Sequence, residues 1–142
     1  AISLFGEPDS SIYVPVMLDS GVDGGGTLVL QYVDFVCTIV CSKITDSYGS
    51  NEIHGEKGNI IFPGSGTVEK IEFIDRETKV CEPFSIEQTN NDMVYEIETF
   101  TDIIKTGDEE RYVELANLSG IVLNIMEHTR KQCGIIFGPD KQ

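Results

Sequence analysis

The sequence predicts an α+β domain: a single antiparallel-rich, mixed sheet of about six to seven strands, with two C-terminal helices packed on one of its faces. Three observations predict this class. Residues 12–86 form short β-prone segments between turn residues, residues 93–133 carry apolar residues at helical spacing, and the two kinds of segment occupy separate parts of the chain. The other face of such a sheet is either wet or covered, and we expect it to be open for dimerisation.

Three strands are expected before residue 45. Residues 12–18 are apolar and β-prone, although Pro15 restricts them to an edge or irregular strand. The turn-rich residues 19–26 then lead into residues 27–44, which are rich in Val, Ile, Thr and aromatic side chains. This stretch contains two strands joined by a turn with Asp34 at its tip.

Two further strand pairs follow. Residues 51–62 predict a hairpin whose turn is formed by residues 55–58, because the glycines at both ends of that turn permit a positive φ angle. Residues 67–74 alternate clearly between apolar and polar side chains, whereas residues 78–86 form a weaker strand. The predicted total is therefore about seven strands.

The apolar spacing changes to that of helices in the C-terminal third. Four apolar residues recur at i, i+4, i+7 and i+11: Met93, Ile97, Phe100 and Ile104. Asn91 or Asp92 can cap the start of this helix, and Gly107 can end it. A second helix is expected over about residues 109–133, and residues 134–137 can add a short final strand.

Charge and composition exclude several classes of function. The 142 residues make one ordinary domain, and their formal net charge of −14 disfavours binding to nucleic acids or anionic membranes. No apolar run approaches the roughly 18 residues that a membrane span needs. The four cysteines lack C-x-x-C spacing and are expected to be buried free thiols, which suits a reducing cytoplasm: Cys37, Cys41, Cys81 and Cys133.

Motifs for nucleotide binding are incomplete. Gly64 and Gly66 follow a predicted strand, but Glu69 occupies the position of the third glycine, and a strand rather than a helix should come next. The triple glycine at residues 24–26 also precedes a strand. We therefore expect no cofactor-binding residue in this chain.

Glu52, His54 and Glu56 occupy every second position of the predicted hairpin. They could form a metal site or an acid/base site, or simply the wet face of a strand. Their Cβ atoms should lie about 7 Å apart, and the other histidine, His128, belongs to the last helix. We favour a solvated or pocket-lining face and predict no metal ligand. We also predict no catalytic residue, since no serine lies in a G-x-S-x-G motif and the two histidines have no clear triad partners.

Taken together, these segments resemble the C-terminal domain of the Gfo/Idh/MocA oxidoreductases. The resemblance covers about residues 12–137 and is most telling in the hairpin "EIHGEKGNI" and in the helix positions Glu96, Phe100, Ile104 and Gly107. It implies a parent enzyme that transfers hydride between NAD or NADP and a sugar, polyol or related hydroxyl compound. In that family an N-terminal Rossmann domain holds the cofactor, while the C-terminal domain closes the substrate pocket and presents its open sheet face to a partner subunit.

The sequence lacks the family's G-x-G-x-x-G, E-K-P and D-x-x-x-H segments, so none of their residues can be placed on it. We therefore expect residues 1–142 to be the C-terminal substrate and oligomerisation domain of a longer bacterial, cytoplasmic oxidoreductase. Such a domain should be inactive alone and should form a homodimer or higher homo-oligomer. A stand-alone dimerising interaction module is the alternative, and a small acidic metal-binding protein is a third possibility.

Substrate contacts are expected in the loop that precedes the hairpin, residues 42–50. Lys43, Asp46 and Tyr48 are polar groups at a strand end, where pockets often open. An ordinary polar loop is the alternative interpretation.

Overall fold

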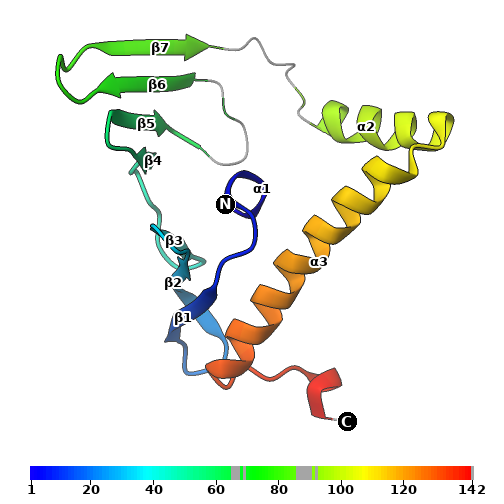
Figure 1. Cartoon of the computed structure of the whole chain (residues 1–142). Helices are drawn as coiled ribbons and strands as arrows, with labels where there is room; N and C mark the ends of the chain where they lie inside the picture. The colour runs from blue at the N-terminus through cyan, green and yellow to red at the C-terminus, as the bar shows by residue number, and fades with distance from the viewer. Residues whose placement is uncertain (65–67, 69, 86–90, 92, 142) are drawn as a thin grey trace. The chain divides into compact units, whose positions relative to one another are not determined.

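The computed structural model describes the whole chain apart from residues 65–67, 69, 86–90, 92 and 142. The chain divides into two compact units, and each is described separately below (Figure 1). The terminal unit comprises Ala1–Asp46 and Asp108–Gln142, so both ends of the chain contribute to it. The central unit comprises Ser47–Gly107.

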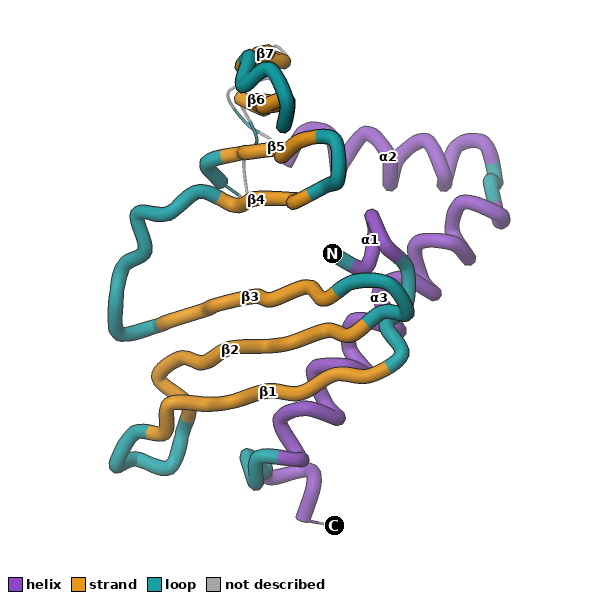
Figure 2. Tube along the Cα trace, turned by 60° about the vertical axis from the view of Figure 1, so that its left-hand side comes forward, coloured by secondary structure: helices purple, strands orange, loops and turns teal. Residues whose placement is uncertain are grey.

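The terminal unit is built on a three-stranded antiparallel sheet. Its strands are β1 (Ser10–Met17), β2 (Asp23–Gln31) and β3 (Val36–Ser42), in the order β1-β2-β3, and they lie side by side in Figure 2. The short helix α1 (Ile2–Phe5) precedes the sheet, and the long helix α3 (Glu109–Gln132) packs against β1 and α1. Because β1 is an edge strand, Pro15 is accommodated as predicted.

One face of this sheet forms the core of the terminal unit. Leu30 is 1% exposed, and Tyr32 and Ile135 are also buried. Cys133, which directly follows α3, donates its thiol to the carbonyl oxygen of Tyr13 on β1 at 3.0 Å. A contact that links residues 120 positions apart shows that α3 covers this face.

The opposite face of the sheet is exposed and apolar. The register brings alternate residues of the three strands onto this open face: Ile12, Val14, Val16, Thr27, Val29, Val36, Thr38 and Val40. Val14 and Val40 are 61% and 75% exposed, and none of these positions is charged. An uncharged sheet surface of this kind is typical of an interaction site.

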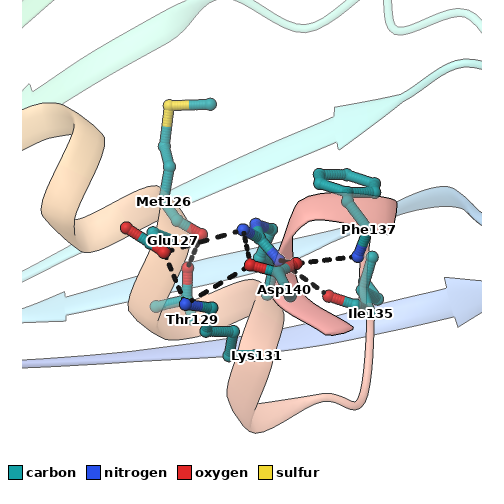
Figure 3. A network of polar contacts seen from close by, with 8 residues as sticks. Met126, Glu127, Thr129, Lys131, Ile135, Phe137 and Asp140 are labelled. Carbon is teal, nitrogen blue, oxygen red and sulfur yellow. Dashed lines mark hydrogen bonds and ion pairs between the residues drawn. The ribbon is translucent and has the colours of Figure 1, made fainter. Parts of the chain in front are cut away.

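The C-terminal end of the terminal unit is fastened by Asp140, in the 3₁₀ turn η1 (Gly138–Lys141). Its carboxylate accepts two hydrogen bonds from the guanidinium of Arg130, at 2.6 and 3.0 Å, and one from the backbone N–H of Phe137 at 2.8 Å. Lys131 lies 3.4 Å from the same carboxylate (Figure 3). These contacts hold the pKa of Asp140 well below its ordinary value, chiefly because of the hydrogen bond from Arg130.

The central unit contains a four-stranded antiparallel sheet and helix α2 (Met93–Thr106). Its strands follow the order β4-β5-β6-β7: β4 (Asn51–His54), β5 (Gly58–Phe62), β6 (Lys70–Asp75) and β7 (Cys81–Ser85). One face carries Ile53, Ile60 and Phe73 in register. The other, which we call the polar face, carries Glu52 and Glu72 on either side of Ile61. The first face is therefore the more apolar of the two.

The α+β class and the seven strands are confirmed, but the expectation of one continuous sheet is wrong. The described strands form two separate ladders of three and four strands. Residues 43–50, which separate β3 from β4, have no regular structure, so the two hairpin systems are not joined by a tight turn. Residues 134–137 form no strand either.

The expected packing of both helices on one face also requires correction. Helix α3 packs on the sheet of the terminal unit, whereas α2 belongs to the central unit and has no buried residue. The helix boundaries are close to those predicted. Asn91 accepts a hydrogen bond from the N–H of Met93 at 3.2 Å, and Gly107 has a φ angle of 66°; the other proposed cap, Asp92, lies outside the described residues.

Candidate substrate-contact loop

The candidate loop begins where β3 ends, in the terminal unit. The backbone N–H of Lys43 donates to the carbonyl of Gly24 at 2.7 Å, which extends the pairing with β2 by one residue. The hydroxyl of Ser42 then accepts hydrogen bonds from the N–H groups of Ile44 and Thr45, at 3.2 and 3.0 Å. The first residues of the loop are therefore held in a defined turn.

The three residues predicted to contact substrate fall in both units. Lys43 and Asp46 belong to the terminal unit, and Tyr48, which is 96% exposed, belongs to the central unit. All three side chains are exposed. Their assignment to a substrate pocket stays a prediction.

Lys43 is held by an acidic partner, Asp23, which lies 20 residues earlier in the sequence. Its ammonium donates to the Oδ1 atom and to the backbone carbonyl of Asp23, each at 3.2 Å. The other carboxylate oxygen of Asp23 accepts the hydroxyl of Tyr13 at 2.9 Å. Three strands thus contribute to one polar cluster, since Tyr13 lies on β1, Asp23 begins β2 and Lys43 follows β3.

The cluster has well-defined protonation states. The pKa of Asp23 is lowered, first by the hydrogen bond from Tyr13 and then by that from Lys43. The pKa of the Tyr13 hydroxyl is raised, mainly by burial and then by its bond to Asp23. At neutral pH, Asp23 is therefore a carboxylate acceptor and Tyr13 a neutral donor.

The glycines at positions 24–26 permit close packing within the sheet rather than the binding of a phosphate, and Gly26 makes room for the ring of Tyr13. A Cβ atom on Gly26 would lie 2.6 Å from the ring of Tyr13, and one on Gly25 would lie 2.8 Å from the carbonyl oxygen of Cys41. Because all three glycines lie within strand β2, no helix N-terminus follows them. The sequence signal that could have revealed Asp23 was its position directly before these glycines.

The hairpin residues Glu52 and His54 lie on the polar face of the central sheet. The Nε2 atom of His54 is 2.7 Å from Glu52, and their side chains are 71% and 44% exposed, with His54 the more exposed of the two. Glu56 lies in the turn after β4 and is also exposed. Within the described residues, no group of three or more His, Cys, Asp or Glu side chains could hold a metal ion. The solvated-face interpretation agrees with this exposure.

The apolar face of the same hairpin contains a shallow hollow of about 430 Å³. Its floor includes Ile53, Ile60 and Phe73, and the turn residues Glu56 and Lys57 form part of its lining. A Cβ atom on Gly58 would lie 2.5 Å from the ring of Phe73, so this position requires glycine. The lining is suited to apolar contacts.

The described residues around Gly64 do not fit a dinucleotide cofactor. Gly64 follows strand β5, and the next described element is strand β6, so no described helix begins here that could bind a pyrophosphate. Gly66 and Glu69, the other two positions of the incomplete glycine motif, lie outside the described residues.

None of the helices that the structure describes combines the length and the apolar character needed to span a membrane.

All four cysteines are free, as predicted. Cys41 and Cys81 are exposed, however, while Cys37 and Cys133 are half-buried, so the expectation of buried thiols was wrong for the exposed pair. On the strands, alternate side chains face away from the core, and this places Cys81 on the polar face of the central sheet.

Comparisons with known proteins identify relatives of this chain. No family model matches it. It is 34% identical over 142 residues to the oxidoreductase YgjR of Escherichia coli (strain K12), and 36% identical over 141 residues to the scyllo-inositol 2-dehydrogenase (NADP(+)) IolU of Bacillus subtilis (strain 168). Each match includes 99% of this chain. The chain spans about two-fifths of the length of these relatives, 42% and 43%.

Solved structures share the fold. An oxidoreductase from Klebsiella pneumoniae matches 89% of this chain with a TM-score of 0.57 at 19% identity, over 43% of its own length. The oxidoreductase YvaA from Bacillus subtilis matches 92% with a TM-score of 0.60 at 15% identity, over 46% of its own length. The chain is therefore similar to part of these oxidoreductases, which agrees with its resemblance to the C-terminal domain of the Gfo/Idh/MocA family.

Proposed function

We propose that this chain is the C-terminal substrate and oligomerisation domain of a longer bacterial oxidoreductase. The enzyme would use NAD or NADP and act on a sugar, polyol or related hydroxyl compound. The observation that carries this proposal is homology over 99% of the chain to two oxidoreductases that are more than twice its length, one of them named as an inositol dehydrogenase. The four free thiols support a cytoplasmic location.

The work of such an enzyme would be divided between domains. A Rossmann domain preceding residue 1 would hold the dinucleotide and supply the hydride chemistry, so residues 1–142 alone would be inactive. This chain would supply one wall of the substrate pocket. Lys43, Asp46 and Tyr48 are its proposed contacts with substrate hydroxyl groups, because they are exposed polar side chains in the loop that follows β3.

The experiment that tests this proposal is the mass of the native product in its own cells, captured with an antibody against residues 1–142. We expect a polypeptide longer by about 190 residues, because 142 residues are 42–43% of the length of the related oxidoreductases and the remainder is the size of one additional domain. That polypeptide should bind NADH or NADPH, whereas residues 1–142 should not. A native product of 142 residues, or micromolar binding of NADH by residues 1–142, would contradict the proposal.

We further propose that the open face of β1–β3 binds the same face of a second copy. A two-fold interface brings identical surfaces together, and this face is uncharged in a chain whose net charge is −14. Charged surfaces would repel each other in such a pairing, so the uncharged sheet face is the favoured contact. The β-branched side chains of this face, led by Val14 and Val40, would supply the buried apolar area.

The same exposed face also favours a second candidate function, a stand-alone dimerising interaction module. Oligomeric state alone does not separate the two candidates, because both predict a dimer. The mass of the native product does separate them. A dimer of 142-residue chains would favour the interaction module.

A further inference from the structure

The cluster of Tyr13, Asp23 and Lys43 has a consequence for the ligand that the loop accepts. We propose that Asp23, held in place by Tyr13, positions the Lys43 ammonium and makes this site select uncharged hydroxyl groups over anionic ones. Asp23 would be a positioning and specificity-determining residue. The proposal rests on the proposed function in one respect, namely that Lys43 contacts the substrate.

The hydrogen bonds leave both a donor and an acceptor available to a ligand. Lys43 has three N–H groups and directs two contacts to Asp23, so one N–H is free to donate. Each oxygen of the Asp23 carboxylate accepts one hydrogen bond from the side chains of the cluster, and a carboxylate oxygen can accept two. A hydroxyl group can accept from Lys43, and a neighbouring hydroxyl can donate to Asp23. Adjacent hydroxyls of a polyol therefore match this pair.

The local charge disfavours an anionic ligand. The carboxylate of Asp23 offsets the single positive charge of Lys43, at a separation of 3.2 Å. Asp46, three residues further along the loop, adds another negative charge. A carboxylate or phosphate group would therefore meet no net positive charge here, whereas a hydroxyl needs none.

Tyr13 fixes the orientation of the carboxylate. Its ring lies against Gly26, and its backbone carbonyl accepts the thiol of Cys133 at 3.0 Å, so β2 and the end of α3 both restrain it. Its hydroxyl stays protonated at neutral pH and donates to the Oδ2 atom of Asp23. Oδ1 is thereby directed toward Lys43, whose side chain is 70% exposed and would otherwise sample many rotamers.

The test uses the native, longer polypeptide and compares a neutral with an anionic substrate. kcat and KM are measured with scyllo-inositol and with glucuronate for wild type, Asp23→Asn and Tyr13→Phe. Asp23→Asn should raise KM for scyllo-inositol and lower it for glucuronate, each by roughly three- to tenfold, with smaller changes in kcat. Tyr13→Phe should act in the same direction but less strongly.

The matched control is Glu72→Gln. This change breaks an ion pair on the central sheet, in which Glu72 lies 2.7 Å from the ammonium of Lys70. It should leave KM unchanged for both substrates. If wild type is active and Asp23→Asn keeps the wild-type ratio of kcat/KM values, the inference is overturned while the proposed function stands. If wild type oxidises no hydroxyl compound, the proposed function and the ligand assignment both fail.

The positioning of Lys43 has a readout that is independent of activity. Residues 1–142 are treated briefly with acetic anhydride, and the modified lysines are quantified by mass spectrometry. Asp23→Asn should free the Lys43 amine from its ion pair, so that Lys43 is labelled several-fold faster, with Lys57 unchanged as the internal reference. Equal labelling of Lys43 in the two proteins would overturn the positioning role.

Discussion

Single carboxylates organise two parts of the terminal unit. Asp140 gathers Arg130, Lys131 and the N–H of Phe137 at the C-terminal end, and Asp23 gathers Tyr13 and Lys43 at the end of the sheet. The position of Asp23 directly before three glycines is a weak sequence signal, and Asp140 has none, because both acquire their partners only when segments separated in the sequence come together. Lys43 could be identified from its position at a strand end, but its partner could not.

Asp140→Asn should loosen the C-terminal turn. The folded-state pKa of Asp140 is depressed, so its stabilising contacts are fully present above the unfolded value of about 3.9 and are lost as the pH falls through the folded value. At pH 6 the Phe137 amide, which donates to Asp140 at 2.8 Å, should exchange with solvent faster in the variant. Amide exchange followed by NMR measures this difference.

The difference between wild type and Asp140→Asn should shrink as the pH falls below about 4. Asp34→Asn, in the turn between β2 and β3, is the control and should leave the Phe137 amide unchanged. Equal exchange rates in wild type and Asp140→Asn at pH 6 would show that the Arg130 contact does not restrain this turn.

At the scale of elements, local periodicity was sufficient to predict each of the seven strands and the two long helices. The alternation before residue 86 and the helical spacing after Met93 are properties of neighbouring residues, and the structure reproduces both. Which strands pair across a long connection is a non-local property. The β4–β5 hairpin could therefore be predicted from its glycine turn, whereas the break between β3 and β4 could not be predicted.

Two glycines in or next to helices should respond to alanine in opposite directions. Gly107 ends α2 with a φ angle of 66°, so Gly107→Ala should destabilise the chain by about 1 kcal/mol. Gly120 lies within α3, and a Cβ atom there would meet nothing within 4 Å, so Gly120→Ala should stabilise the chain by about 0.5–1 kcal/mol. Urea unfolding followed by circular dichroism at about 222 nm, the helical band, measures both changes. Equal effects would contradict the assigned backbone conformations.

At the scale of the whole molecule, the open face of β1–β3 is an exposed, uncharged surface that a partner could cover. If a second copy covers it, Val14→Asp and Val40→Asp should each convert a dimer into a monomer, because a buried, unpaired carboxylate is strongly unfavourable in an apolar interface. Light scattering coupled to size-exclusion chromatography gives the mass directly.

Val33→Asp provides the control for this test, since Val33 is 84% exposed but lies in the turn between β2 and β3, outside the open face. It should leave the mass unchanged. A wild-type protein that stays monomeric at high concentration, or face variants that remain dimeric, would exclude this surface as the contact between copies.

The division of the chain into units also sets the order in which the two units can be completed during synthesis. The central unit, Ser47–Gly107, is contiguous, so all of its residues leave the ribosome before any of α3 does. The sheet of the terminal unit is synthesised before the central unit, but α3 packs against its edge strand β1 only after Glu109–Gln132 have emerged. During that interval both faces of β1–β3 are uncovered, and the nascent chain is then a candidate for chaperone binding until its last residues emerge.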